Sequence, residues 1–380
     1  MYFRETFDRS DAVSQRRPQL LGGVAVREDK YEYWLCQTKY LRLQSMRRLR
    51  ETFVHARAVY EAPARLLERC SFLTEKEKKA LLEGKKDGGW EKQWQEMGER
   101  GIRVFTYFND GYPERLRHIY QPPKCLYVKG NLPDETKIAL AIVGARDCSV
   151  YGRDMARMFG FRLAEQGIQV ISGMAKGVDG WSHQGALEAG GGTFAVLGTG
   201  VDVCYPSSHQ ALYRSIARHG GVISELPIHT KAMPPYFPQR NRIISGLSQG
   251  VLIVEARERS GSLITADAAL EQGRDVFVIP GRIGDDLSEG CNRLIRQGAV
   301  LVLSPQDILQ YYKLDSAAEQ PRQAESDDLL LACMQINPMH IDSIIAETKL
   351  SPTEAMKGLI RLCRNRKIEE VGRGYYQKKL

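Results

Sequence analysis

The 380-residue sequence lacks the patterns that define several common classes of protein. Its eight cysteines are scattered and none forms a Cys-x-x-Cys pair, which argues against a zinc site or a disulfide framework and favours reduced, mostly buried thiols. No uncharged run approaches the length of a membrane span, and the first residues have no apolar stretch suited to a signal peptide. We therefore predict a cytoplasmic protein that has no membrane partner.

Nucleotide-binding and catalytic signatures are also scarce. The sequence contains neither a P-loop nor a Gly-x-Gly-x-x-Gly fingerprint. Its seven histidines form no His-x-x-x-His pair, and we interpret His183 as an ordinary helix residue. Many anion donors beside few acid–base groups are more typical of binding than of catalysis, although Glu255 could still act as a base. We predict a protein that is not an enzyme and has no metal or cofactor.

Charge is unevenly distributed along the chain. Residues 1–135 carry most of the net charge of +8, whereas residues 136–312 are nearly neutral. A polyanion that binds the middle of the chain must therefore be recognised by a local patch. The basic excess of the N-terminal part is equally compatible with a solvated basic surface.

Hydrophobic patterns divide the chain into a helical N-terminal domain (1–100), a core with its lead-in (101–312), a polar linker (313–326) and a small C-terminal domain (327–380). Regular alternation of strands with helices in the core predicts an α/β fold with a Rossmann-like, doubly wound, mostly parallel sheet. Ligands of such sheets bind beyond the carboxyl ends of the strands. The strand-like runs of the core are 137–143, 168–172, 193–197, 221–224, 251–254, 276–279 and 299–303.

The C-terminal domain has the pattern of a winged helix. Ser351 precedes Pro352 and lies three residues before Glu354, which is a strong signal for the start of a helix. Residues 368–376 predict a hairpin that turns at the segment 372–374. Helices followed by a small hairpin favour a winged-helix fold.

A glycine turn follows the first strand of the core. Gly144 lets backbone approach a ligand, Arg146 can contact a phosphate with two N–H groups, and Ser149 can cap the helix that Gly152 enters while donating to the same anion. We interpret the turn as a phosphate-binding element. The alternative is an ordinary strand–helix turn in which Arg146 is solvated.

Two other turns offer the same kind of donors. After the second strand, Ser172 and Gly173 lead to Lys176, which lies between glycines, and to Asp179, which is suited to cap the next helix. Later, a helix start combines the backbone and hydroxyl donors of Ser260, Gly261, Ser262 and Thr265. Both turns are also compatible with capped helices that bind no ligand.

Residues 234–242 combine prolines, aromatics and arginines. Prolines exclude regular structure and hold Phe237 outward, and Arg240 and Arg242 flank Asn241 at the start of a predicted helix. Aromatic rings beside arginines suit the bases and phosphates of single-stranded nucleic acid. The alternative is a loop whose aromatic residues pack on the sheet.

Together these segments resemble the DNA-processing protein A family of bacteria (DprA, also called Smf). The resemblance runs in unbroken order over residues 101–310. It rests on Gly144-x-Arg146, Ser149-x-Tyr151-Gly152, Ser172-Gly173-Met174, Phe237-Pro238-x-Arg240-Asn241-Arg242 and Ser260-Gly261-Ser262-Leu263-Ile264-Thr265.

The resemblance implies a recombination mediator that binds and protects single-stranded DNA, forms homodimers and loads RecA recombinase during natural transformation. It also implies an N-terminal domain similar to a sterile-alpha-motif or helix–hairpin–helix domain, in a divergent form because residues 41–59 contain no glycine. The residues it assigns to DNA or phosphate binding are Gly144, Arg146, Ser149, Gly152, Ser172, Gly173, Lys176, Phe237, Arg240, Asn241, Arg242, Ser260, Gly261, Ser262 and Thr265.

Two other functions are compatible with the same residues. The pattern Ser260-Gly261-Ser262-x-x-Thr265 resembles, more loosely, nucleotide phosphoribohydrolases of the lysine-decarboxylase-like group. Their Pro-Gly-Gly-x-Gly-Thr-x-x-Glu motif has a doubled glycine that is missing here. A regulator that binds a mononucleotide without turnover is the other alternative.

Overall fold

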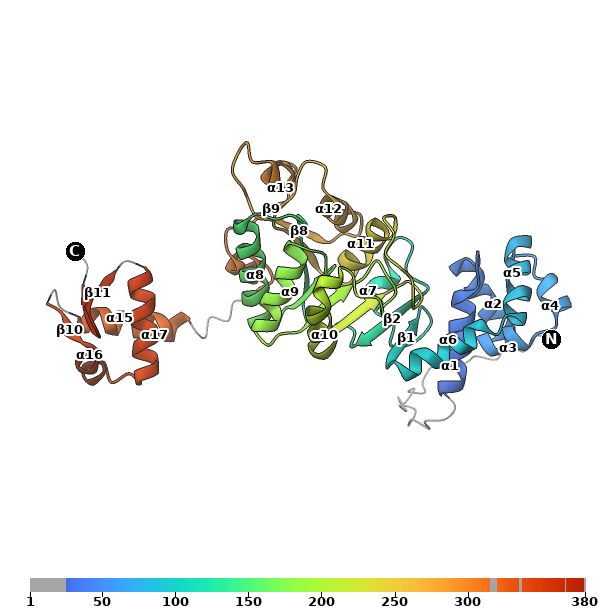
Figure 1. Ribbon diagram of the computed structural model, residues 1–380, viewed down its shortest axis with the longest axis horizontal. Coiled ribbons are helices and arrows are strands. Elements are labelled where there is room, and N and C mark those ends of the chain that lie inside the picture. The colour runs from blue at the N-terminus through green and yellow to red at the C-terminus, as the bar shows by residue number, and fades with distance from the viewer. Residues whose placement is uncertain (1–24, 315–319, 335–336, 366, 379–380) are drawn as a thin grey trace, which may run out of the picture. The chain divides into compact units, whose positions relative to one another are not determined.

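The computed structural model describes residues 25–314, 320–334, 337–365 and 367–378. The chain divides into two compact units, with the boundary between Leu303 and Ser304. Figure 1 labels helices and strands of both units. The boundaries expected at residues 100 and 326 remain predictions. Among the described residues, no helix has the length and apolarity needed to cross a membrane.

The N-terminal part of the first unit is helical, as its spacing predicts. Its helices are α1 (Ala25–Gln37), α2 (Leu43–Phe53), α3 (Ala56–Glu61), α4 (Ala64–Glu68), α5 (Glu75–Lys86) and α6 (Gly89–Glu99).

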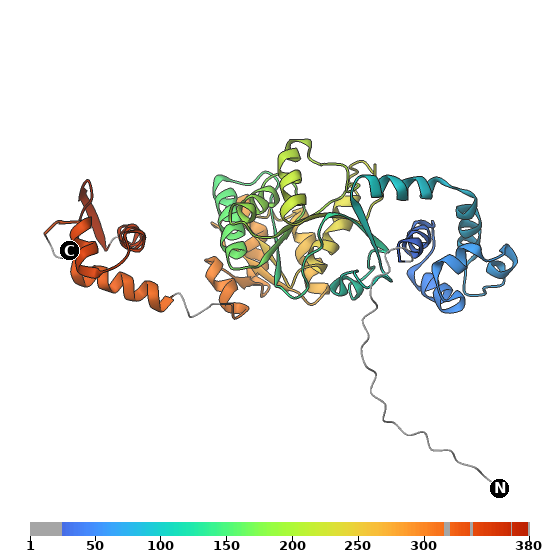
Figure 2. The same cartoon turned by 90° about the horizontal axis from the view of Figure 1, so that it is seen from below.

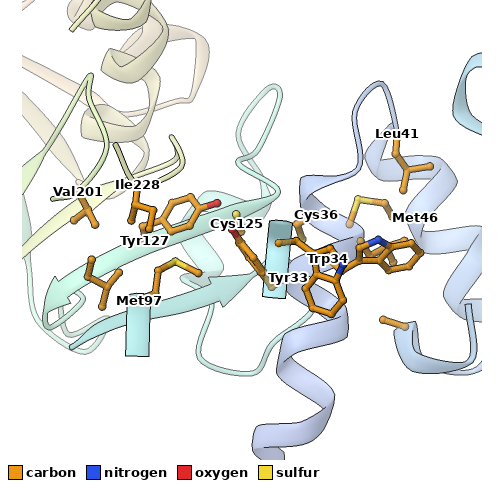
Figure 3. Close-up of a cluster of buried hydrophobic side chains, with 14 of the residues drawn as sticks. Tyr33, Trp34, Cys36, Leu41, Met46, Met97, Cys125, Tyr127, Val201 and Ile228 are labelled. Carbon is orange, nitrogen blue, oxygen red and sulfur yellow. The ribbon is translucent and has the colours of Figure 1, made fainter. Parts of the chain in front are cut away.

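One hydrophobic cluster joins these helices to the sheet (Figure 3). Tyr33 of α1 packs edge-on against Tyr127 of β2 (Cys125–Gly130), with ring centroids 6.3 Å apart. Gln37 donates to the Tyr127 hydroxyl at 2.5 Å, and the Cys36 thiol donates to the Lys124 carbonyl at 3.3 Å. The helices therefore continue the core of the unit.

A nine-stranded sheet forms the centre of the first unit, in the order β1-β2-β6-β5-β4-β3-β7-β8-β9. Each of the seven strand-like runs of the core overlaps a strand. The strand β2 was not predicted, and it pairs antiparallel with β1 and β6, whereas the other pairs are parallel. The remaining strands are β1 (Ile102–Thr106), β3 (Ala139–Val143), β4 (Gln169–Ser172), β5 (Thr193–Val196), β6 (Gly221–Ser224), β7 (Gly250–Ile253), β8 (Asp275–Val278) and β9 (Val300–Leu301).

Helices cover both faces of this sheet, so its fold is the expected doubly wound α/β architecture (Figures 1 and 2). Alternate residues of β3, Ala139, Ala141 and Val143, share a core with helices α11 and α12. The helices are α7 (Glu114–Arg117), α8 (Val150–Glu165), α9 (Val178–Glu188), the 3-10 turn η1 (Ser207–His209), α10 (Gln210–His219), α11 (Tyr236–Gly246), α12 (Gly261–Glu271) and α13 (Asp286–Arg296).

Strand order reverses at β3. The chain runs outward from β3 through β4, β5 and β6, and then returns to the other side of β3 with β7. In open α/β sheets, the crevice beyond the strand ends at such a reversal is where ligands bind.

The second unit contains helices and a three-stranded antiparallel sheet in the order β10-β12-β11. Ser351 caps α17 in a capping box with Glu354, as predicted. Helix α15 begins at Gln320, inside the segment expected to be linker, and the winged-helix assignment remains a prediction. The elements are α14 (Pro305–Tyr311), α15 (Gln320–Cys333), β10 (Met339–His340), α16 (Ile341–Thr348), α17 (Pro352–Arg364), β11 (Ile368–Gly372) and β12 (Tyr375–Lys378).

A buried carboxylate ties two of the N-terminal helices together. Glu77 of α5 accepts hydrogen bonds from the backbone and Nε of Arg42, each at 3.0 Å, and from the backbone N–H of Thr74 at 2.8 Å. Burial acts to raise the pKa of Glu77, but these hydrogen bonds outweigh it and hold the pKa well below its usual value.

We expect Glu77→Gln to lower the free energy of unfolding by about 2 kcal/mol at neutral pH, because the amide loses charge-assisted hydrogen bonds. The depressed pKa means that this stabilisation is present above the ordinary glutamate pKa of about 4.3 and is lost as pH falls below it. Urea unfolding at a series of pH values measures the difference between the two proteins. Glu75→Gln, in the same helical turn but exposed, is the control. A deficit in Glu77→Gln that does not shrink in acid would contradict this account.

Candidate nucleic-acid interface

A pocket of about 660 Å³ opens beyond the carboxyl ends of β3, β4 and β7, where the strand order reverses. Most of the segments that line it follow these strands or belong to the starts of α11 and α12, and residues after β5 and β6 and in α13 complete the lining. It brings together most of the predicted residues: Gly144, Arg146, Phe237, Arg240, Asn241, Ser260, Gly261, Ser262 and Thr265. The other predicted residues do not line it: Ser149, Gly152, Ser172, Gly173, Lys176 and Arg242.

An exposed cation and an aromatic ring lie side by side in this pocket. The Arg146 guanidinium lies 5.3 Å from the centroid of the Phe237 ring, and Phe237 in turn lies 5.4 Å from the ring of Tyr205. Arg146 is exposed, and Phe237 is half-buried. The pair offers a planar stacking surface next to a positive charge that solvent can reach.

Arg240 lines the pocket, but its side chain is buried and does not extend into solvent. Its guanidinium donates to the carbonyls of Gly173, at 2.9 Å, and Val196. Burial lowers the pKa of Arg240 to about 10, and the nearby Asp179 carboxylate acts against that shift. The same burial raises the pKa of Asp179, and Arg240 acts against it. The two side chains are therefore a buried pair of opposite charges.

The segment around Arg240 differs from the irregular loop expected from its prolines. Helix α11 already begins at Tyr236, so Pro238 lies in its first turn, where the missing N–H costs little. Arg240 and Arg242 consequently lie inside the helix. The Arg242 side chain forms an ion pair with Glu225.

The predicted anion site at the start of α8 already holds a carboxylate of the chain. Ser149 caps this helix, as predicted, by accepting from the backbone N–H of Gly152 at 3.0 Å. The Ser149 hydroxyl and backbone N–H, however, both donate to Glu255, the latter at 2.9 Å. A Cβ on Gly152 would lie 2.2 Å from that carboxylate, which explains the glycine. The expectation that Ser149 also donates to a phosphate therefore differs from the structure, because Glu255 takes that place.

Polar groups of the second glycine turn, residues 172–180, also form hydrogen bonds within the chain. Ser172 is buried and donates to the Ile142 carbonyl at 2.6 Å. The Gly173 N–H donates to Asp179 at 3.1 Å, and a Cβ on Gly173 would lie 2.5 Å from the Arg240 guanidinium. Asp179, expected as the helix cap, lies within α9, whose cap position is Gly177. Lys176 is exposed at this turn but is not among the lining residues.

Comparison with known proteins gives this pocket a context. The sequence profile of the family described as DNA recombination-mediator protein A matches residues 103–313. Over 209 residues the chain is 44% identical to DNA processing protein DprA of Streptococcus pneumoniae, which covers 55% of this chain and 74% of that protein. It is also 47% identical over 200 residues to Protein Smf of Escherichia coli, covering 52% of this chain and 54% of that protein.

The chain belongs to the DNA recombination-mediator protein A family.

Two solved structures of the family support the fold. The X-ray structure of DprA from S. pneumoniae superposes with a TM-score of 0.63 at 36% identity, covering 74% of this chain and 97% of that chain. A structure of DNA processing protein A from Helicobacter pylori, described for its single-stranded DNA binding mode, gives a TM-score of 0.50 at 28% identity and covers 56% of this chain and 97% of that chain. The Rossmann-like fold and the family predicted from the motifs are confirmed.

Sequence reasoning did not assign to the site three residues of the pocket that can contact an anion or stack on a base. Arg257 and Arg259 are exposed on the loop after β7, and Tyr205 stacks beside Phe237. The two arginines directly precede the predicted Ser260 turn, and this proximity was the available signal. The lining also contains Arg146 and Arg240, whereas its acidic residues are Asp147 and Asp179. Cationic side chains therefore outnumber anionic ones among the residues that line the pocket.

The start of α12 adds anion donors to these charges. Ser260 caps the helix by accepting from the backbone N–H of Ser262 at 3.3 Å. Asn241 donates to the Gly261 carbonyl at 3.2 Å and so ties α11 to this turn. The positive end of the helix lies at the pocket that Arg146 and Arg259 also line.

The residues that resemble catalytic groups do not line the 660 Å³ pocket. His183 is fully buried beside Thr193, and burial lowers its pKa to about 3, so it is neutral at physiological pH. Segment 246–250 has the Gly-x-Ser-x-Gly spacing of a nucleophile elbow, but it precedes β7, and the buried Ser248 donates to the Ile244 carbonyl. Over the described residues, no group of three or more His, Cys, Asp or Glu side chains is arranged to hold a metal ion.

We expect Arg240→Met to lower the free energy of unfolding by about 3–5 kcal/mol, because it leaves Asp179 buried without its positive partner. Arg162→Met, on the exposed side of α8, is a matched control and should change it by less than about 0.5 kcal/mol. Urea unfolding followed by circular dichroism measures both. Equal costs for the two substitutions would show that the buried pair contributes nothing special.

Proposed function

We propose that this chain binds single-stranded DNA in the 660 Å³ pocket and acts there as a recombination mediator. The observation that carries the proposal is the stacked pair Arg146 and Phe237, set beside Arg257, Arg259 and the start of α12. Rings stack on unpaired bases of any sequence, and exposed cations and helix N-termini bind phosphates. The single-stranded DNA binding mode described for the H. pylori structure is consistent with this assignment.

Three further properties belong to the proposal through the family. The protein forms homodimers, loads RecA recombinase onto the bound strand during natural transformation, and works in the cytoplasm without catalysing a reaction. RecA loading is tested by following RecA assembly on DNA already coated with single-strand-binding protein, with and without this chain. Sedimentation tests the dimer.

We expect labelled oligothymidine of about 20 nucleotides to bind more tightly than the matching duplex, with an affinity that falls steeply with salt. Arg146→Ala with Arg259→Ala should weaken binding at least about tenfold and reduce the salt slope by about 0.7 for each phosphate that the variant no longer neutralises. Fluorescence anisotropy at several salt concentrations measures both quantities.

Arg162→Ala is the control for this pair, because it removes an exposed arginine of α8 that is not among the lining residues. Unchanged affinity in the double variant, or binding that is insensitive to salt, would count against the pocket as the DNA site.

We expect no release of free base from nucleoside monophosphates, the activity of the phosphoribohydrolase alternative. The Glu255 carboxylate is held by Ser149 at the start of α8, and Glu255 is not among the residues that line the 660 Å³ pocket. Chromatography of the incubated nucleotides checks this prediction. Base release that Glu255→Gln abolishes would favour the enzyme instead.

A further inference from the structure

A second cavity, of about 320 Å³, opens at the same edge of the sheet beyond β7 and β8. Its lining includes Glu255 after β7, Gly281 and Arg282 after β8, and Ser288 of α13. Tyr151, from the first turn of α8, completes it. Nothing in the proposed function so far uses this cavity.

The two cavities share two stretches of backbone, residues 255–257 and 287–288. The Glu255 carbonyl accepts from Ala145 at 2.8 Å, and the Ala256 N–H donates to Leu287 at 2.8 Å. Leu287 lines the larger pocket, and its neighbour Ser288 lines the smaller one. A strand that passes Arg146 can therefore present consecutive nucleotides to both cavities.

A buried carboxylate with free acceptor capacity lies in the smaller cavity. Glu255 is only 5% exposed, and each of its carboxylate oxygens accepts one hydrogen bond from Ser149 and keeps a lone pair for another donor. The same lining contains the buried Ser288 and, at its exposed rim, Asp285, whose carboxylate accepts from the backbone N–H of Leu287 at 3.2 Å. Two carboxylates disfavour a phosphate here and favour a neutral group that carries N–H donors.

The mouth of this cavity suits a nucleotide. Tyr151 is half exposed and lines the same cavity as Glu255, and burial together with the Glu255 carboxylate raises the pKa of Tyr151. Arg282 is exposed and has no ion pair among the described residues. A ring that stacks on a base and a cation for the adjoining phosphate are the two elements of a single-strand site.

We propose that the 320 Å³ cavity is a base pocket that selects guanine in the bound single strand. Guanine presents two adjacent N–H donors, which match the free lone pairs of the Glu255 carboxylate. Adenine and cytosine place an acceptor beside their amino group, and thymine has one N–H between two carbonyls. The inference rests on the proposed single-stranded DNA binding and adds sequence preference to it.

The test compares three labelled oligonucleotides of equal length: oligothymidine, alternating thymine–guanine, and alternating thymine–hypoxanthine. Lithium salts prevent guanine quadruplexes. We expect the guanine strand to bind about tenfold more tightly than oligothymidine, the scale of one two-pronged base contact. Hypoxanthine lacks the 2-amino group and should fall between them.

Glu255→Gln should bring the affinity ratio of the guanine and thymine strands from about ten to about one. The glutamine NH2 group replaces one acceptor oxygen and would face one of the two guanine N–H donors, so that hydrogen bond is lost. Glu258→Gln, exposed on the same loop, is the matched control and should keep the ratio. Melting temperatures confirm that each variant is folded. If Glu255→Gln does not fold, Tyr151→Ala on the exposed mouth carries the test and should also lower the ratio.

The outcomes separate this inference from the proposed function. Tight oligothymidine binding with a ratio of one in the unmodified protein overturns the base pocket and leaves the proposed function intact. A guanine preference that survives both Glu255→Gln and Tyr151→Ala also overturns it. Failure of every strand to bind overturns both.

Discussion

The buried pair of Arg240 and Asp179 is the interaction on which the candidate site depends. The Arg240 guanidinium donates to the carbonyls of Gly173 and Val196, at the ends of β4 and β5. The Asp179 carboxylate accepts from the backbone N–H of Gly173. One pair of charges thus fixes helices α9 and α11 relative to two strands. A charge removed from water needs hydrogen-bond partners and an opposite charge nearby, so the geometry around it has little freedom.

This constraint divides the polar residues of the site into two groups. Ser149, Ser172, Arg240 and Asp179 direct their hydrogen bonds to the chain itself. Arg146, Arg257 and Arg259 remain exposed on the framework that the first group holds in place. A rigid framework presenting exposed cations loses little conformational entropy when a flexible polyanion binds.

The sequence was sufficient for the alternating core, because glycine turns and buried apolar runs are local signals. It was insufficient for β2, whose pairing with β6 joins residues far apart in the chain. The motifs also located the pocket, but they did not distinguish free donors from occupied ones. The local sequence predicts Ser149 as a phosphate ligand. In the structure, its hydroxyl and backbone N–H donate to Glu255, which lies more than a hundred residues later in the chain. Likewise, Pro238 indicates a loop although it fits the first turn of α11.

The two edges of the nine-stranded sheet have a consequence for how copies of this protein behave when crowded. The edge strand β1 is covered by α1 and α6, and the opposite edge strand β9 is only two residues long. A sheet with long free edges offers its unpaired backbone to the next molecule and can grow into aggregates. Within the described residues, helices pack against one edge strand of this sheet and the other is very short, which disfavours fusion of the sheets of neighbouring copies.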